Sequence, residues 1–205
     1  MSLEHWAWLG IAAQPGNKIV DDILRVFPDP EEFFLSGDSY AVSDNQNNVK
    51  AEFEVKVMTL TGRVVTQYNK KVTVPANTST VLYDEATEKV LNGAKAEDLV
   101  IVSSLRIGDK VYSNNNYFVK QGALNFPKAN VKADVAKTAT GVEITLSTDN
   151  FARAVYLSVD DIDNFFENNY IDLLPNSTCK VAVKTSLSVE EFKRQLKIEH
   201  LGNCR

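Results

Sequence analysis

The chain has 205 residues, of which 44% are hydrophobic and 24% are charged. These proportions are typical of soluble globular proteins and argue against a disordered chain, a collagenous chain or a disulfide framework. The length fits one large domain or two small ones, and it is short for a barrel enzyme of about 250 residues. Because 27 acidic residues outnumber 22 basic ones, we expect neither nucleic acid nor a membrane surface as a partner.

The first 34 residues differ in pattern from the rest of the chain. We expect residues 1–34 to be a helical N-terminal segment or a cloning remnant. The opening residues lack a basic stretch followed by an apolar one, so a periplasmic or exported location would require a signal removed before residue 1. The apolar residues at helical spacing, between Gly16 and Pro28, are Ile19, Val20, Ile23, Leu24 and Phe27.

From residue 49 onward, apolar and polar residues alternate, which is the pattern of half-buried β-strands. A long hairpin over 49–74 turns at Thr61-Gly62, and Lys70 is the one polar residue on its apolar face. Asn114-Asn115-Asn116 interrupts a later strand, which indicates a bulge or a sheet edge. The other elements expected in this half are a strand over 79–83, one or two helical turns over 85–91, and strands over 99–107 and 110–119.

A linker between Gly122 and Lys128 precedes a second alternating region. Ser188 and Glu191 stand three residues apart, which predicts a capping box and a brief helix. The strands expected here lie near 131–135, 142–146, 155–159, 170–174, 179–183 and 196–201.

Both alternating regions contain six or seven short strands in roughly 80–90 residues, which is the pattern of an immunoglobulin-like sandwich. Each also places a proline and an asparagine just before a strand, at Pro75-Ala76-Asn77 and at Pro175-Asn176, which predicts the same corner in both. The expected fold class is all-β, with two tandem immunoglobulin-like β-sandwiches over residues 35–121 and 122–205 and a short helical N-terminal segment.

Few residues could carry covalent or metal chemistry. His5 lies near the terminus, and His200 is in phase with the apolar residues of the last strand, where a buried structural role is expected. Cys179 and Cys204 could form a disulfide or remain two separate thiols. A zinc site would have to borrow His5 from the far terminus, so we predict no catalytic residue, no metal and no cofactor.

Acidic residues occur in groups that could serve as catalytic or metal-binding carboxylates. A glycosidase needs two carboxyl groups that face each other across a cleft, whereas neighbours on a strand point apart. Calcium could bind at the group that ends in Asn164, but the glycine turn and distal bidentate glutamate of a calcium loop are missing, so we interpret it as a solvated loop. The groups are Glu31-Glu32, Glu190-Glu191 and Asp160-Asp161-Asp163.

Aromatic residues provide candidate stacking surfaces for sugar rings. Phe165-Phe166, beside the acidic loop, is the most suggestive pair. The alternative interpretation is that these rings fill sandwich cores or a seam between domains. The candidates are Trp6, Trp8, Tyr112, Tyr117, Phe165, Phe166 and Tyr170.

Two stretches of the second region, Leu146–Ser158 (LSTDNFARAVYLS) and Phe165–Pro175 (FFENNYIDLLP), carry a family resemblance. They closely resemble the C-terminal immunoglobulin-like domain of β-mannosidases in glycoside hydrolase family 2. Further upstream, four stretches look like the sandwich that precedes it, so that the resemblance covers residues 38–200. They are Val42-Ser43-Asp44, Leu60–Val64, Val74–Ser79 and Asn116–Val119.

The resemblance implies a retaining mannosidase whose acid/base and nucleophile glutamates lie in a (β/α)8 barrel, and no position of this chain matches those motifs. It implies that this chain is a non-catalytic accessory part, with the barrel as its partner and a mannose-containing saccharide as a second one. Packing against a barrel would leave an apolar patch exposed on these sandwiches. Two other functions stay open: a stand-alone carbohydrate-binding module and an immunoglobulin-like module that binds proteins.

Overall fold

The computed structural model describes residues 24–28, 39–160 and 164–203. Its strands form four sheets, and the chain separates into two compact units. The first comprises the described residues up to 55 together with 68–90 and 102–114. The second comprises 56–67, 91–101 and the described residues from 115 onward. The predicted divisions after residues 34 and 121 stay predictions.

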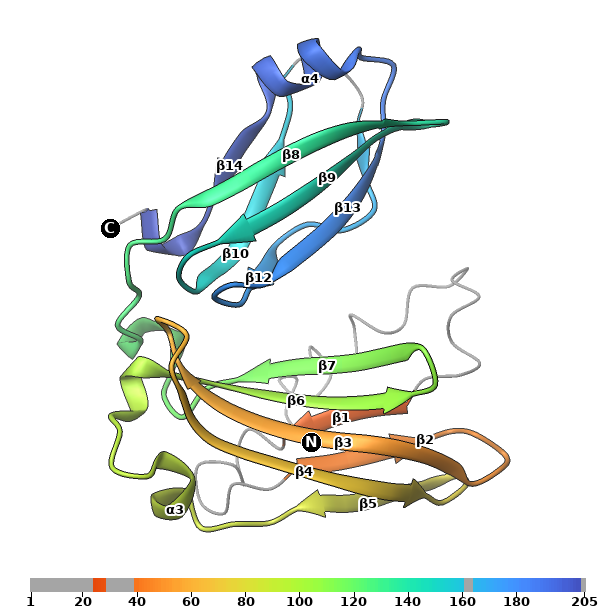
Figure 1. The fold of residues 1–205 in the computed structure, drawn as a ribbon, viewed down its shortest axis with the longest axis vertical. Helices are drawn as coiled ribbons and strands as arrows, with labels where there is room; N and C mark the ends of the chain where they lie inside the picture. Colours follow the sequence, from red (N-terminus) through yellow and green to blue (C-terminus); the bar gives the residue numbers. More distant parts are fainter. Residues whose placement is uncertain (1–23, 29–38, 161–163, 204–205) are drawn as a thin grey trace, which may run out of the picture. The chain divides into compact units, whose positions relative to one another are not determined.

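A three-stranded antiparallel sheet in the order β1-β2-β5 forms one layer of the first sandwich (Figure 1). Strand β1 (Leu24–Pro28) pairs with β2 (Ser39–Ser43), which pairs with β5 (Thr78–Tyr83). The predicted helix is therefore wrong over Leu24–Pro28, and its earlier part, residues 19–23, lies outside the described residues. A few apolar residues at helical spacing are weak evidence for a helix, because the local pattern does not show whether another strand will pair with the segment. Here β2 supplies hydrogen-bonding partners for the backbone of β1.

The other layer is a four-stranded sheet in the order β4-β3-β6-β7 (Figure 1). The predicted alternation along β3 is confirmed, since Phe53, Val55 and Val57 are at most 1% exposed. Lys70 is exposed because β4 is an edge strand. Strand β7 lies at the opposite edge, one of the two possibilities predicted, but the asparagine run ends this strand rather than interrupting it, so the predicted extension to residue 119 is wrong. The strand bounds are Val49–Thr59 for β3, Val64–Val74 for β4, Leu99–Ile107 for β6 and Lys110–Asn116 for β7.

Contacts between these two layers are both polar and aromatic. The hydroxyls of Ser39 on β2 and Ser103 on β6 are fully buried and lie 3.2 Å apart, so each satisfies the other. Tyr83 on β5 packs on Tyr68 of β4, with ring centroids 5.1 Å apart. Helix α3 (Thr87–Leu91) follows β5 where a helical turn was predicted, and η2 (Ala96–Asp98) leads into β6.

The second sandwich is built from a three-stranded sheet, β12-β10-β14, and a four-stranded sheet, β11-β13-β9-β8. Its core buries residues from both sheets, including Ile144 and Leu146 of β9 and Val155 and Leu157 of β10. The predicted strands are confirmed. The bounds are β8 Val131–Thr138, β9 Gly141–Thr148, β10 Ala152–Ser158, β11 Phe165–Phe166, β12 Ile171–Leu173, β13 Thr178–Lys184 and β14 Lys197–Glu199, with η3 over Gln121–Ala123 and η4 over Leu201–Asn203.

Helix α4 (Val189–Gln195) begins with the predicted capping box. The Ser188 hydroxyl accepts from the Glu191 amide at 3.3 Å, and the Glu191 carboxylate accepts from the Ser188 amide at 3.1 Å. Phe192 on this helix is fully buried in the core of the second sandwich. Among the described residues, no helix has the length and apolar character needed to span a bilayer.

The two predicted corners share one backbone device. Asn77 and Asn176 adopt positive φ angles of 49° and 57°, and each stands just before a strand, β5 or β13. Asparagine tolerates this left-handed conformation better than most residues. The all-β prediction, with two successive sandwiches, is therefore confirmed. The predicted shared corner is also present, before β5 in the first sandwich and before β13 in the second.

Candidate functional site

Several of the described side chains that could act as acids, bases or ligands make contacts within the fold. His200 is 3% exposed, and burial lowers its pKa while a hydrogen bond to the Ala129 backbone opposes that shift. Glu191 caps α4, and Asp160 pairs with Lys197. The carboxylates at Glu31-Glu32, Asp161 and Asp163 lie outside the described residues, as does His5. Within the part of the chain that the structure describes, no three His, Cys, Asp or Glu residues gather as a metal site.

Cys179, on β13, is a free thiol whose pKa burial raises, so it favours the protonated form. Cys204 lies outside the described residues. The choice that the sequence left open, a disulfide between the two cysteines or two separate thiols, therefore stays open.

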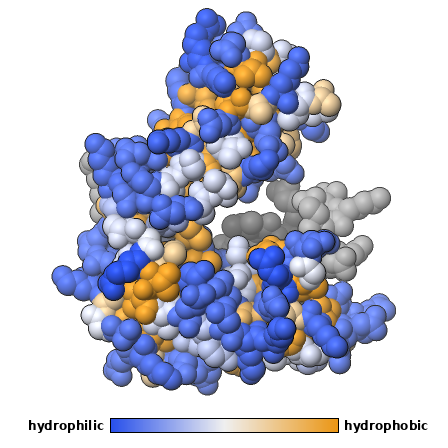
Figure 2. Space-filling model, viewed as in Figure 1, coloured by the Kyte–Doolittle hydropathy of each residue, from blue (hydrophilic) through white to orange (hydrophobic). Residues whose placement is uncertain are grey.

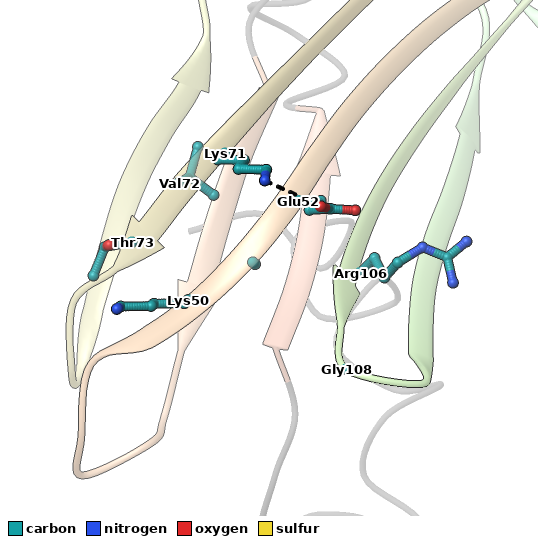
Figure 3. Close-up of a pocket in the computed structure, with 8 residues that line it drawn as sticks. Lys50, Glu52, Lys71, Val72, Thr73, Arg106 and Gly108 are labelled. Atoms are coloured by element: carbon teal, nitrogen blue, oxygen red, sulfur yellow. Dashed lines mark ion pairs between the residues drawn. The ribbon is translucent and has the colours of Figure 1, made fainter.

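A shallow groove of about 440 Å³ crosses the outer face of β4, β3 and β6 (Figure 3). Lys71 points toward Glu52, and their Nζ and Oε1 atoms are 4.0 Å apart. Lys50 and Arg106 point in opposite directions, away from this pair. Because its charged groups diverge, the groove offers no converging set of groups to hold a ligand.

Only part of the predicted aromatic set is accessible. Phe165 is 64% exposed with the Lys184 ammonium 5.8 Å from its ring centroid, whereas Phe166 packs 6.4 Å from Phe192 of the core. Tyr112 is half-buried on β7. Trp6 and Trp8 lie outside the described residues. The predicted Phe165-Phe166 pair is therefore divided between solvent and core, because neighbours on a strand face opposite sides.

Tyr117 belongs to a polar cluster in the second unit. Its hydroxyl donates to Asp172 Oδ2 at 2.7 Å, and the Arg153 guanidinium carbon lies 4.3 Å from its ring centroid. Arg153 also forms an ion pair with Asp172, with 3.6 Å between Nη1 and Oδ2. Burial, followed by the Asp172 charge, raises the pKa of Tyr117 well above its usual value. These contacts hold Tyr117 in place rather than leaving it free for a ligand.

Aromatic packing extends this cluster. Phe151 is 1% exposed and lies between two rings, with its centroid 6.0 Å from that of Tyr117 and 6.4 Å from that of Phe126. Its amide donates to the Leu60 carbonyl at 2.8 Å. For Tyr117, the interpretation as structural packing is thus supported over a sugar platform.

Tyr170 is the most exposed of the large hydrophobic side chains in the described residues, at 69%. Its ring stacks on that of Tyr156 of β10, with centroids 5.0 Å apart and planes inclined by 28°. Tyr156 was not among the candidates from the sequence. The available signal was its phase, because Tyr156 alternates with the buried Val155 and Leu157 and so faces outward.

The backbone that presents Tyr170 is unusual. Its φ angle is +56°, a left-handed value that costs about 1–3 kcal/mol for a bulky residue. Asn169 compensates with its side chain, which accepts from the amides of Leu157 at 2.8 Å and Tyr170 at 3.1 Å and donates to the Leu157 carbonyl at 2.8 Å. The Asn169 side-chain amide thus bonds to both backbone groups of Leu157, as the backbone of a neighbouring strand would.

A bulge on β10 lies next to this pair. The register with β12 shifts between Ala152 and Val155, where Ala154 has a φ angle of +51°. The Ala154 amide donates to Asp172 Oδ1 at 2.9 Å, so the same carboxylate that holds Tyr117 also satisfies the bulge. Bulges of this kind redirect side chains.

Large hydrophobic side chains are scattered elsewhere on the surface. Val64, Val81, Val111 and Phe165 are 45–64% exposed, and each belongs to a different strand. Figure 2 shows hydrophobic colour in separate patches on a mainly hydrophilic face. The predicted apolar patch for a barrel therefore stays a prediction.

Two family models match the chain in succession. The "Mannosidase Ig/CBM-like domain" matches residues 38–121, and an "Ig-fold domain" of mannosidases matches residues 126–204. No curated protein matches the sequence.

Solved structures share the fold. The β-D-mannosidase from Dictyoglomus thermophilum is 18% identical with a TM-score of 0.69, over 88% of this chain and 22% of that one. The exo-β-D-glucosaminidase CsxA is 13% identical with a TM-score of 0.55, over 88% of this chain and 26% of that one. The chain thus spans about a quarter or less of the length of these structures. From the two successive family matches, residues 38–121 and 126–204 belong to the immunoglobulin-like accessory domain families of mannosidases.

Proposed function

We propose that this chain is the accessory part of a β-mannosidase-like glycoside hydrolase and that its sandwiches buttress a catalytic (β/α)8 barrel. The observation that carries the proposal is the succession of the two mannosidase domain families in one chain. The chain is similar in fold to a β-D-mannosidase, and the match covers only 22% of the length of that enzyme. This likeness supports a larger parent enzyme.

The contacts that the carboxylates make favour a structural role for this chain over a catalytic one. Asp149 accepts from the amide and side chain of Asn130 at 2.8 Å and 2.6 Å, and these bonds lower its pKa. Glu143 pairs with Lys180 at 2.7 Å across β9 and β13. Together with Asp172, these groups make bonds that shape the sandwich. A glycosidase acid and nucleophile would instead face a substrate cleft.

The test is to produce this chain and the barrel of its parent enzyme as separate polypeptides. We expect the two to elute together, and the melting temperature of the barrel to rise in the mixture because a partner that binds only the folded state stabilises it. An unrelated immunoglobulin-like sandwich of similar size is the control. A barrel that elutes alone, with unchanged melting temperature and mannosidase activity, would contradict the proposal.

A further inference from the structure

We propose that Tyr156 and Tyr170 form a stacking site for the pyranose ring of a neutral saccharide. This tyrosine platform goes beyond the support of a barrel, and it does not depend on the barrel being present. Two alternatives among the described residues are weaker, since the groove near Glu52 has diverging charges and the Phe165 ring has the Lys184 ammonium 5.8 Å from its centroid.

The geometry of the two rings is that of a supported binding surface. Tyr156 lies beneath Tyr170 at 5.0 Å between centroids, while Tyr170 is 69% exposed. The inner ring therefore supports the outer ring, whose free side is open to solvent. A pyranose presents a face of C–H groups that packs on such a ring, and a tyrosine ring offers a rigid contact area with few rotatable bonds.

The ring position is fixed before any ligand arrives. Asn169 makes three hydrogen bonds, to both backbone groups of Leu157 and to the Tyr170 amide, and it thereby holds Tyr170 in its left-handed conformation. The bulge at Ala154, bonded to Asp172, shapes β10 just before Tyr156. The Asn169 bonds and the bond between Ala154 and Asp172 thus hold two strained parts of the backbone. Strained backbone held in this way is typical of a preorganised site.

The surroundings match a polyhydroxylated ligand. Tyr156 pairs with Glu199 across β10 and β14, and residues directly opposite in an antiparallel pair share one face of the sheet. Lys197, two residues away on β14, lies on the same face opposite Ser158. Glu199 is exposed and supplies acceptors for hydroxyl groups next to the rings.

The same surroundings count against a protein partner. The fully buried core of a protein interface is depleted of charged residues, whereas Glu199 and Lys197 lie next to the tyrosine platform. An exposed ring with hydrogen-bonding groups beside it instead suits a single sugar ring, which can stack through its C–H face and bond through its hydroxyl groups. The class of ligand is therefore a neutral pyranose, for which β-1,4-mannotriose is a suitable probe.

The experiment is an NMR titration of the full chain, with its seven tyrosines carrying ¹³C in their rings, against β-1,4-mannotriose. We expect the Tyr156 and Tyr170 ring signals to shift saturably with a Kd of about 1 mM, which is the range of a single stacked ring with few hydrogen bonds. Tyr170→Ala should weaken binding about tenfold or more, while Phe165→Ala, at the other exposed ring, should leave the Kd unchanged.

Three further variants distinguish a loss of the binding site from a loss of folding. Tyr170→Phe should keep the stacking and most of the affinity. Asn169→Ala should weaken binding several-fold although both rings remain, and Glu199→Gln should weaken it while backbone amide spectra stay native. The proposal is overturned if the tyrosine signals do not saturate up to about 20 mM, or if Tyr170→Ala binds as well as the unchanged chain. Neither result depends on whether the chain binds a barrel.

Discussion

The hydrogen bond between Tyr117 and Asp172 should contribute measurably to the stability of the second unit. Tyr117→Phe removes the 2.7 Å bond and leaves Asp172 with the Ala154 amide at 2.9 Å and with Arg153. Bonds to a charged group contribute about 1.5–3 kcal/mol. Because the Asp172 side chain is 23% exposed and keeps other partners, the lower end applies, and we expect a loss of about 1.5 kcal/mol.

A double-mutant cycle separates this bond from the other contacts. Asp172→Asn removes the charge facing both Tyr117 and Arg153, so its cost should be larger, about 2–3 kcal/mol. If the two groups interact directly, the double variant should lose about 1 kcal/mol less than the sum of the single ones. The assay is urea unfolding followed by near-ultraviolet circular dichroism, with hydrogen exchange of the Ala154 amide as a local readout.

Tyrosinate absorbance gives an independent check. The pKa of Tyr117 is raised by burial first and by the Asp172 charge second, so Asp172→Asn should lower it only partly toward 10. A raised pKa in the folded state means that this stabilisation is present below pH 10 and is lost as the pH rises through the folded pKa. Single variants whose costs add within about 0.3–0.5 kcal/mol would refute a direct interaction.

Three other changes probe the fold. Gly141→Ala should destabilise the second sandwich by about 3 kcal/mol or more, because a Cβ there would lie 2.1 Å from the Val183 carbonyl oxygen. Gly93 has open space around it, so Gly93→Ala should cost only about 1 kcal/mol in thermal unfolding. Equal costs for the two variants would contradict the predicted clash at Gly141. Ser188→Ala should cost about 1 kcal/mol by removing the cap of α4, and an unchanged urea midpoint would show that the capping box is dispensable. His200 has a lowered pKa, so stability should fall as the pH drops below about 6.5. His200→Gln should flatten that part of the profile, and an unchanged profile would contradict this.

Much of the fold follows from local pattern. Alternation along β3 and β9 predicted which residues are buried, because a strand with one dry face cannot shift its register by one residue without exposing its core. The cap at Ser188 and Glu191 was likewise predictable, since both partners lie within one turn of the chain. These features depend on neighbours in sequence.

The features that local pattern did not reveal depend on distant partners. Leu24–Pro28 form a strand because β2 is available to pair with them, which the spacing of Leu24 and Phe27 does not reveal. Tyr170 adopts a left-handed conformation that its residue type disfavours, and only the Asn169 bonds to Leu157 explain it. The aromatic candidates were identified by composition, but exposure distinguished Tyr170 from Phe166 and Tyr117.

The most direct test of the central claim is a hydrolysis assay on the purified chain alone with p-nitrophenyl β-mannoside. The account predicts release of nitrophenol at the rate of buffer, because it places the acid and the nucleophile in the barrel of the parent enzyme. Saturable hydrolysis by the pure chain, lost when it is unfolded by heat, would contradict the account.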